Sequence, residues 1–284
     1  MSSAKQDSID DGALGNHPID EKISRSVDFG HEKVSPTEKT RRVGEVFSSV
    51  ATRYDMMNDL MSFGTHRLMK RMLLEMSALR LGNRLLDLAG GTGDIAALAS
   101  PIVGPTGQVV LADINAEMLA VGRDRLLNKG LTNCETIRLN AEVLPFADNF
   151  FDCITIGFGL RNVTHKEVAL AEMHRVLRPQ GVLLVLEFSH VENPLLRGAY
   201  KSFQALWPTA GRVLANDSDS YRYLVESIEV HPKQAGLKLL LEDAGFERVE
   251  YQNLVGGAAA IHRGEATGNA APGYPTSSAE MAGE

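Results

Sequence analysis

The sequence predicts an α/β fold: a doubly wound, mostly parallel seven-stranded sheet, with an N-terminal helical lid and a helical insertion before the last two strands. Short apolar runs alternate with longer segments of helical period, which implies right-handed crossovers between parallel strands. Two of the runs, QVVLAD and GVLLVLEF, are apolar at nearly every position, as expected of strands covered on both faces. The first run, RLLDL, leads into a glycine-rich turn.

The helical lid and the first half of the sheet come first along the chain. We expect helices over residues 37–55 and 66–79, the first capped by Ser35 and begun by Pro36. The elements that follow are a strand at 84–88, a helix at 93–100 that stops at Pro101, a strand at 108–113, a helix at 115–130 with Leu119, Leu126 and Leu127 on one side, and a strand at 136–139.

The second half of the sheet is interrupted by the insertion. The expected elements are a strand at 151–156, a helix through Leu170, Met173 and Leu177, a turn at 178–181 and a strand at 181–188. Residues 193–230 form a helical, aromatic-bearing insertion where substrate specificity is expected to reside. A helix through Leu237 and Leu241 then leads to strands at 247–254 and 256–263, which are close enough to pair as an antiparallel hairpin at the sheet edge.

Composition bounds the domain and its partners. Of the 284 residues, 44% are hydrophobic and 23% charged, as in an ordinary globular protein. Residues 1–35 and 264–284 lack apolar periodicity, so we expect disordered tails on either side of a domain over residues 36–263. The formal net charge of −7, without a basic stripe, argues against a nucleic-acid partner.

Cysteine and histidine spacing favours no metal. Cys134 and Cys153 are single cysteines in apolar runs, typical of core thiols in a reducing compartment, and the eight histidines are scattered. No apolar run approaches the length of a membrane span and no signal peptide is evident. We therefore expect a cytoplasmic protein, with contact to the inner face of a membrane left open.

The glycine turn predicts a nucleotide-like cofactor. Gly91, Thr92 and Gly93 begin a G-x-G-x-x-A match to the dinucleotide fingerprint, and Asp113 lies about twenty residues further on, where it can accept hydrogen bonds from a ribose. Taken alone, this pattern supports a nicotinamide-dependent dehydrogenase. A tight turn also needs glycine for conformational reasons alone.

Asp87, which ends the strand before the turn, separates two cofactor classes. A pyrophosphate beside this carboxylate would bring like charges together in a partly desolvated site, which is costly. The sulfonium and amino groups of S-adenosylmethionine are cationic, so an acidic strand end attracts them. We therefore expect S-adenosylmethionine, with Asp87 as a source of negative field at the mouth of the turn.

A third cofactor element follows the strand at 136–139. In NAEVLPF, Asn140 can meet an adenine edge while Leu144 and Phe146 cover the ring face. Asn140 can equally be a turn residue.

These motifs resemble those of a known family. LDLAGGTGD, LADIN, NAEVLPF, FDCITIGFGLRNV, HRVLRPQGVLLVLEFS and ANDSDSYRYLVESI occur in this order, preceded by NDLMSFGTHRLMKR. Over roughly residues 29–263 they are similar to the ubiquinone/menaquinone biosynthesis C-methyltransferases, the UbiE/COQ5 group of class I methyltransferases. The resemblance implies a Rossmann-like sheet and S-adenosylmethionine-dependent methylation of a ring carbon on a polyprenylated benzoquinol, demethylmenaquinol or both.

The resemblance also assigns cofactor contacts. By their positions in the motifs, Thr92, Asp113, Asn140 and Ala141 would contact the cofactor. The family often has serine where this chain has Gly157, so a hydroxyl contact expected of the family is missing here.

Arg161 is the main catalytic candidate. It lies in the loop after the fourth strand, on the carboxyl edge where doubly wound folds bind ligands. We hypothesise that it stabilises the phenolate that makes the ring carbon nucleophilic, directly or by orienting a water that takes the proton. The alternative is an arginine that pairs with a helix-end carboxylate.

The insertion and the lid supply further candidates. Asp217, Tyr221 and Tyr223 are candidate polar groups around the quinol head, although Tyr221 and Tyr223 cannot both face the same side of one helix, so at least one of them is expected to pack or to lie on the surface. His66 and Arg67 are expected to form part of a lid that excludes water.

Partners and alternative functions stay open at this point. The stretch 195–207, with Arg197 and Lys201, either rests on a bilayer surface or belongs to the core. A quinone-biosynthesis complex and a homodimer are further expectations for the assembly. The alternative functions are an oxidoreductase that uses NAD, and a non-catalytic S-adenosylmethionine-binding subunit of such a complex.

Overall fold

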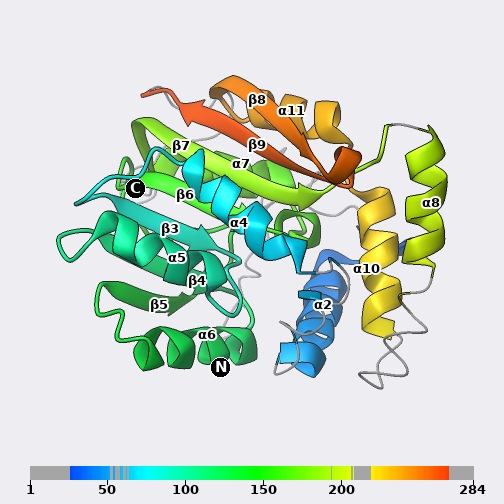
Figure 1. Ribbon diagram of the computed structural model, residues 1–284, viewed down its shortest axis with the longest axis horizontal. Coiled ribbons are helices and arrows are strands. Elements are labelled where there is room, and N and C mark those ends of the chain that lie inside the picture. Colours follow the sequence, from blue (N-terminus) through cyan, green and yellow to red (C-terminus); the bar gives the residue numbers. More distant parts are fainter. Residues whose placement is uncertain are drawn as a thin grey trace, which may run out of the picture.

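Seven strands form one sheet in the order β5-β4-β3-β6-β7-β9-β8, and neighbouring strands are parallel except in the two pairs that involve β9 (Figure 1). The computed structural model describes residues 26–268 except 52–53, 55–57, 60–61, 63, 193, 206 and 208–218. The strands are β3 (Arg84–Leu88), β4 (Gln108–Asp113), β5 (Cys134–Arg138), β6 (Phe151–Gly157), β7 (Leu177–Phe188), β8 (Phe246–Leu254) and β9 (Ala259–Ala266). The predicted sheet and its antiparallel edge pair are confirmed.

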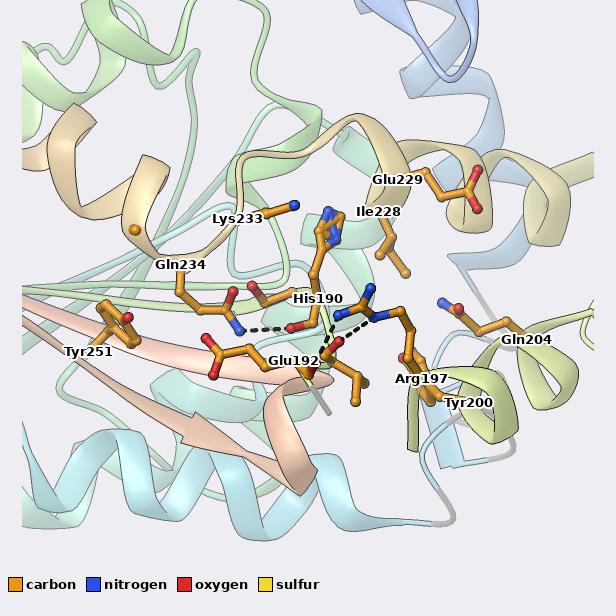
Figure 2. Close-up of a pocket in the computed structure, with 13 residues that line it drawn as sticks. His190, Glu192, Arg197, Tyr200, Gln204, Ile228, Glu229, Lys233, Gln234 and Tyr251 are labelled. Atoms are coloured by element: carbon orange, nitrogen blue, oxygen red, sulfur yellow. Dashed lines mark hydrogen bonds between the residues drawn. The ribbon is translucent and has the colours of Figure 1, made fainter. Parts of the chain in front are cut away.

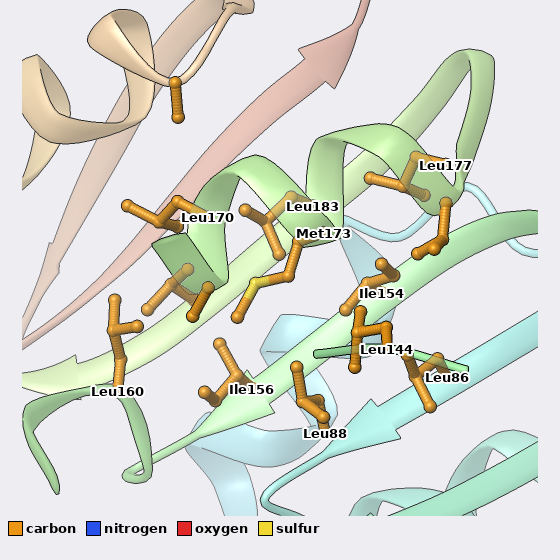
Figure 3. Packing of buried hydrophobic residues seen from close by; sticks show 14 of the residues in the cluster. Leu86, Leu88, Leu144, Ile154, Ile156, Leu160, Leu170, Met173, Leu177 and Leu183 are labelled. Carbon is orange, nitrogen blue, oxygen red and sulfur yellow. The ribbon is translucent and has the colours of Figure 1, made fainter. Parts of the chain in front are cut away.

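Each face of the sheet has its own helices, because successive strand residues face opposite sides. Leu85, Val109 and Leu111 pack against α4 (Thr65–Glu75), α5 (Asp94–Val103) and α6 (Ala116–Asn128). Their neighbours Leu86 and Val110 belong to the opposite cluster, which α7 (Lys166–Val176) and α11 (Gln234–Asp243) cover. Figure 3 shows this second cluster, where side chains of α7 such as Leu170 and Met173 pack over β6 and β3. The two fully apolar faces explain why the strands read as continuous hydrophobic runs.

The carboxyl ends of the parallel strands are covered by helices from distant parts of the chain. The lid helix α2 (Pro36–Val50) lies beside α10 (Asp219–Val230) of the insertion, and α8 (Pro194–Gln204) lies further out (Figure 1). An apolar cluster joins lid and insertion; its members are Val50, Trp207, Tyr221, Leu224 and Ile228. Within residues 195–207, Trp207 and Phe203 therefore pack in the core, as one of the two alternatives predicted, while Leu196 is exposed.

The expectation of a disordered tail up to residue 35 is wrong for residues 26–35. Strands β1 (Val27–Phe29) and β2 (Glu32–Val34) form an antiparallel hairpin that turns at Gly30. Phe29 stacks on Tyr223 of α10 with ring centroids 4.4 Å apart. This long-range contact orders a segment whose own apolar content is too low to predict structure. At the other end of the domain, β9 extends to Ala266, three residues past the expected boundary.

Several expected boundaries also differ. The helix expected to stop at Pro101 continues for two more residues, and Gly104 (φ 65°) caps its end. The first lid helix ends at Val50 rather than at residue 55. Leu127 is 68% exposed, so only Leu126 and Leu119 of that predicted stripe face the core. The expected turn at 178–181 lies within β7, where the register with β6 shifts.

Candidate active site

The glycine turn after β3 is compact because its glycine positions leave little room for side chains. A Cβ on Gly90 would lie 2.5 Å from Leu111 and 2.7 Å from a carboxylate oxygen of Asp87. Gly91 (φ 55°) and Gly93 (φ 76°) adopt the left-handed conformation that favours glycine. Gly93 is also the N-cap of α5, so the turn delivers the N-terminus of that helix to the carboxyl edge of the sheet.

Asp113 closes the turn from the next strand. Its carboxylate accepts hydrogen bonds from the backbone N–H of Gly91 (2.9 Å) and of Asn115 (2.8 Å). Burial raises the pKa of Asp113, although these backbone donors oppose the shift. Each carboxylate oxygen keeps a second lone pair, so the group can still accept from two ribose hydroxyls. The glycine-rich turn and this half-buried acceptor therefore fit the nucleoside half of S-adenosylmethionine.

The sequence predicted that Asp87 lies at the mouth of the turn, and this prediction is wrong. Its side chain is fully buried beneath the turn, where it accepts from Ala96 N (3.0 Å) and from Thr155 Oγ1 (2.9 Å). Burial raises the pKa of Asp87 to about 7. The carboxylate therefore fixes the start of α5 against β6, and it has no exposed surface with which to touch a ligand.

Asp94, the first residue of α5, is held by two cations that the sequence reasoning missed. Lys70 Nζ of the lid helix α4 lies 2.8 Å from Asp94 Oδ2, and Arg125 of α6 pairs with the other oxygen. Burial raises the pKa of Asp94, but these two cations outweigh it and the net pKa is lowered. The sequence carries one signal for this bridge, because Lys70 lies on the buried side of an otherwise apolar helix face.

The segment after β5 forms a tight turn, so its geometry fits Asn140 as a turn residue better than as an adenine contact. Asn140 is exposed, and its side-chain oxygen accepts from Glu142 N (3.1 Å). Leu144 is buried in the core, and Phe146 packs edge-on against Phe151, so the expectation that they cover an adenine face is wrong. Ala141 packs against that same core cluster.

The ends of β3 and β6 meet where the strand order of the sheet reverses, which is the usual ligand crevice of this architecture. Ala89 (φ 49°) and Phe158 (φ 58°) are non-glycine residues in the left-handed region, a strain that commonly marks functional loops. A Cβ on Gly157 would lie 2.7 Å from Ile95 Cδ1. The space that a serine would need at this position is therefore filled by Ile95.

Arg161 lies in the short helix η2 (Leu160–Asn162) directly after this crevice, and it is buried against a partner that sequence reasoning missed. Its Nη1 lies 3.0 Å from Glu187 Oε1, and its backbone N–H donates to Glu187 Oε2. The same guanidinium donates to the Phe158 carbonyl, which ties it to the strained loop. Its Nε is buried and has no hydrogen-bond partner among the described residues. The sequence feature that could have pointed to Glu187 is its position as the single carboxylate at the end of the most apolar strand.

The structure brings Tyr223, rather than Tyr221, to Arg161. The Tyr223 hydroxyl donates to Asn162 Oδ1 (3.0 Å), next to Arg161, and burial raises its pKa to about 12. Tyr221 is 1% exposed and belongs to the apolar cluster between lid and insertion, which makes it a packing residue. Asp217 lies outside the described residues.

The lid candidates take different positions. His66 is buried, with Nδ1 2.9 Å from Ser62 Oγ, and burial lowers its pKa. Arg67 pairs with Asp59 at 2.7 Å and its side chain is mostly exposed. Asn115 fastens α2 over the end of β4, because its Nδ2 donates to Gly44 O (3.0 Å) and Ser48 Oγ (2.9 Å).

Two cavities flank α10, and neither is lined by the glycine turn. The insertion pocket, about 570 Å³, lies between α8, the C-terminal end of α10 and the start of α11 (Figure 2). It is lined by Ser189, His190, Val191, Glu192, Arg197, Tyr200, Gln204, Ile228, Glu229, Lys233, Gln234, Ala235 and Tyr251. The Arg197 guanidinium donates to the carbonyls of Val191 and Glu192.

The second cavity, about 240 Å³, lies between the N-terminal hairpin, the start of α7 and the end of α10. We call it the lysine pocket; it is lined by Ser26, Val27, Asp28, Gly30, Lys39, Arg161, Thr164, His165, Lys166, Glu167, Tyr223, Ser227, Val230 and His231. Within the described part of the chain, no cluster of acidic, histidine or cysteine side chains could hold a metal. No helix there is long and apolar enough to span a bilayer.

Known proteins of one family resemble this chain over most of its length. Ubiquinone/menaquinone biosynthesis C-methyltransferase UbiE of Pseudomonas putida (strain W619) is 57% identical over 238 residues, covering 83% of this chain and 93% of that protein. The UbiE protein of Stutzerimonas stutzeri (strain A1501) is 58% identical over the same shares.

Solved structures agree on the fold. A SAM-dependent methyltransferase from Aquifex aeolicus matches with a TM-score of 0.53 at 21% identity, covering 70% of this chain and 89% of that one. A phosphoethanolamine N-methyltransferase 2 from Haemonchus contortus, solved with S-adenosyl-L-methionine, matches with a TM-score of 0.54 at 14% identity, covering 70% and 52%. These matches show a class I methyltransferase sheet. The model of the ubiE/COQ5 methyltransferase family matches residues 35–266, and this chain belongs to that family.

Proposed function

We propose that this protein transfers a methyl group from S-adenosylmethionine to a ring carbon of a polyprenylated quinol in ubiquinone or menaquinone biosynthesis. The substrate class is 2-methoxy-6-polyprenyl-1,4-benzoquinol, demethylmenaquinol or both. The observation that carries the proposal is Arg161, a buried cation with an unpartnered Nε in the short helix that follows β6. The nicotinamide alternative is set aside because the chain belongs to a methyltransferase family.

The residues around the glycine turn hold the cofactor rather than react with it. Asp113 would accept from the ribose hydroxyls, and Gly91 and Gly93 let the backbone approach closely. When bound, S-adenosylmethionine supplies an electrophilic methyl group, so neither a metal nor a covalent enzyme intermediate is required. Gly157 removes one hydroxyl from this wall and leaves Ile95 in its place.

Arg161 makes the acceptor carbon nucleophilic by stabilising the quinol as its phenolate. Glu187 and the Phe158 carbonyl fix the guanidinium, so its orientation is set before substrate arrives. The unpartnered Nε is the donor left for a phenolate oxygen. An arginine is too basic to accept the proton itself, which must leave to water or another acceptor.

The insertion pocket is the proposed place for the start of the polyprenyl tail. It follows the end of β7 directly, and its volume lies in the range of small-molecule sites. Tyr200, Ile228 and Tyr251 supply apolar surface within it. A substrate of this kind is a membrane component, so we also propose that the protein meets the membrane surface during turnover.

The decisive experiment is methyl transfer with both head groups side by side. The full chain is incubated with methyl-labelled S-adenosylmethionine and either demethylmenaquinol or the polyprenyl benzoquinol, and the product is located by mass spectrometry. Label on the ring carbon of at least one substrate is expected. Cofactor binding without transfer to either quinol would instead favour the non-catalytic subunit. Flotation with liposomes, with and without quinol, tests the membrane contact; protein left entirely in the unbound fraction would contradict it.

A further inference from the structure

Two lysine ammonium groups in the lysine pocket share one backbone carbonyl. Lys39 Nζ of α2 lies 3.1 Å from Val163 O, and Lys166 Nζ of α7 lies 3.3 Å from the same oxygen. The two cations therefore cannot be further apart than the sum of those distances. Like charges so close repel one another, and a single carbonyl dipole does not neutralise them.

Three of the four nearby carboxylates are occupied elsewhere. Asp28 pairs with Lys33 at 2.7 Å, and Glu142 accepts from the backbone N–H groups of Thr164 and His165. Glu187 is engaged by Arg161, and Glu167 is exposed. Among the described residues, none of these four lies within 4 Å of either lysine ammonium group.

His231 supplies a second and independent sign of a missing partner. It is 5% exposed and lines the pocket, and neither of its ring nitrogens has a hydrogen-bond partner among the described residues. Buried polar groups in folded proteins are normally satisfied, so an unsatisfied imidazole at the wall of a cavity indicates a missing partner.

Neighbouring cations add to burial in lowering the pKa of Lys39 and His231, whereas the pKa of Lys166 is lowered by burial alone and its neighbouring carboxylates oppose that shift. Burial, together with Lys166, lowers the pKa of Lys39 to about 8. Burial, together with Lys166 and Arg161, also lowers the pKa of His231 strongly. An anion between these groups would oppose both shifts, as Asp28 and Glu142 already do for Lys39.

We propose that the lysine pocket binds a phosphate group, held by Lys39 and Lys166 with His231 as a third donor. A tetrahedral anion can accept from several donors at once, and it would replace the shared contact on the Val163 carbonyl with direct charge pairing. The cavity of about 240 Å³ has room for a phosphate monoester with water. Bound phosphate would join α2, α7 and α10, and so hold the lid and the insertion together beside Arg161.

The quinol head is a weaker fit to this cavity. Most of its lining residues are charged or polar, whereas a substituted quinol ring offers few hydrogen-bonding groups and much apolar surface. Phosphate binding can therefore fail without affecting the methyl-transfer proposal, although Arg161 and Tyr223 line this pocket as well.

Calorimetry of the full chain with inorganic phosphate tests the site directly, against sodium chloride at matched ionic strength. Lys39→Met and Lys166→Met keep side-chain length and should each weaken phosphate binding by about tenfold or more. Lys238→Met, on the exposed surface of α11, is the matched control and should bind as the parent protein does. Unchanged phosphate affinity in both pocket variants would overturn the proposal, as would no measurable binding by the parent protein.

A spectroscopic arm keeps the test independent of folding defects. Phosphate should shift the ring resonances of His231 in the parent protein, and phosphate binding that leaves them unmoved would place the anion elsewhere and overturn the assignment. Vesicles with phosphatidic acid, compared with phosphatidylcholine alone, distinguish a lipid headgroup from free phosphate as the source. Displacement of phosphate by a soluble quinol analogue would show that the pocket holds the substrate head instead.

Discussion

Arg161 Nη1 lies 3.0 Å from Glu187 Oε1, and both side chains are almost completely buried. Removing one member leaves the other as an uncompensated buried charge, which costs about 3–5 kcal/mol. We expect Arg161→Ala and Glu187→Ala each to lower the free energy of unfolding by this amount. The double variant should lose much less than the sum of the two, as chemical denaturation would reveal; strictly additive losses would contradict the pairing.

Turnover and cofactor affinity should separate at Arg161. Arg161→Lys keeps a charge beside Glu187 but loses the planar fork and the Nε donor, so methyl transfer should fall by about two orders of magnitude. The dissociation constant for S-adenosylmethionine should stay nearly unchanged, because the glycine turn is untouched. Initial rates and calorimetry on the same preparation check both, and equal losses in rate and affinity would refute the catalytic role.

Replacing Asp113 should weaken the binding of S-adenosylmethionine more than it lowers the stability of the fold. Asp113→Ala removes the carboxylate that accepts the hydrogen bond from the Gly91 N–H, and this carboxylate is also the proposed ribose acceptor. We expect affinity for S-adenosylmethionine to fall by about tenfold to a hundredfold, measured by calorimetry. Asp124→Ala removes an exposed carboxylate of α6 and serves as the control. A matching loss in that control would point to a general charge effect.

Two helical glycines should respond in opposite directions to the same substitution. A Cβ on Gly122 of α6 would lie 2.7 Å from the carbonyl oxygen of Gly91, so Gly122→Ala must push the helix away from the glycine turn. We expect lower thermal stability and weaker cofactor binding. Gly44 of α2 has open space at its Cβ position, so Gly44→Ala should stabilise the protein by about 0.5–1 kcal/mol. Thermal melts of both variants provide the comparison, and stabilisation by both would show that the turn yields easily.

Asp87 should impose a pH dependence on stability. Its folded pKa is raised to about 7 from an ordinary value of 3.8, so folding favours the protonated form. The resulting stabilisation is complete below pH 4 and is lost as the pH rises through about 7, at up to about 1.4 kcal/mol per pH unit. Asp87→Asn should remove this contribution. Denaturation curves from pH 4 to 8 for both proteins check it, and parallel pH profiles would contradict the assigned shift.

The sequence was a good guide wherever local chemistry decides the structure. The apolar runs predicted all seven strands of the large sheet but not β1 and β2, and the antiparallel pair at the edge followed from the short connection between β8 and β9. The sequence alone placed Arg161 and Asp113 at the carboxyl edge of the sheet, because the ends of parallel strands meet at one edge. Asp87 was misplaced because strand periodicity does not say how deeply the end of a strand is covered.

The missed residues depend on contacts between segments far apart in the chain. Lys39 and Lys166 are separated by more than a hundred residues, and only the packing of α2 on the loop after β6 brings them to Val163. Likewise, the role of Glu187 could not be predicted from the sequence, because it depends on the ion pair with Arg161. Tyr221 and Tyr223 differ in role because the rotation of α10 is set by its neighbours, which no local pattern encodes.

The hairpin β1–β2 means that the unit of folding is larger than the region that the family model matches. That region begins at residue 35, whereas Phe29 stacks on Tyr223 and Glu32 pairs with Arg42 at 2.8 Å. A chain shortened to residues 35–266 would expose the aromatic face of α10 and open one wall beside Lys39. Protein trimmed to its homology boundary would then be a poorer enzyme for reasons unrelated to its chemistry.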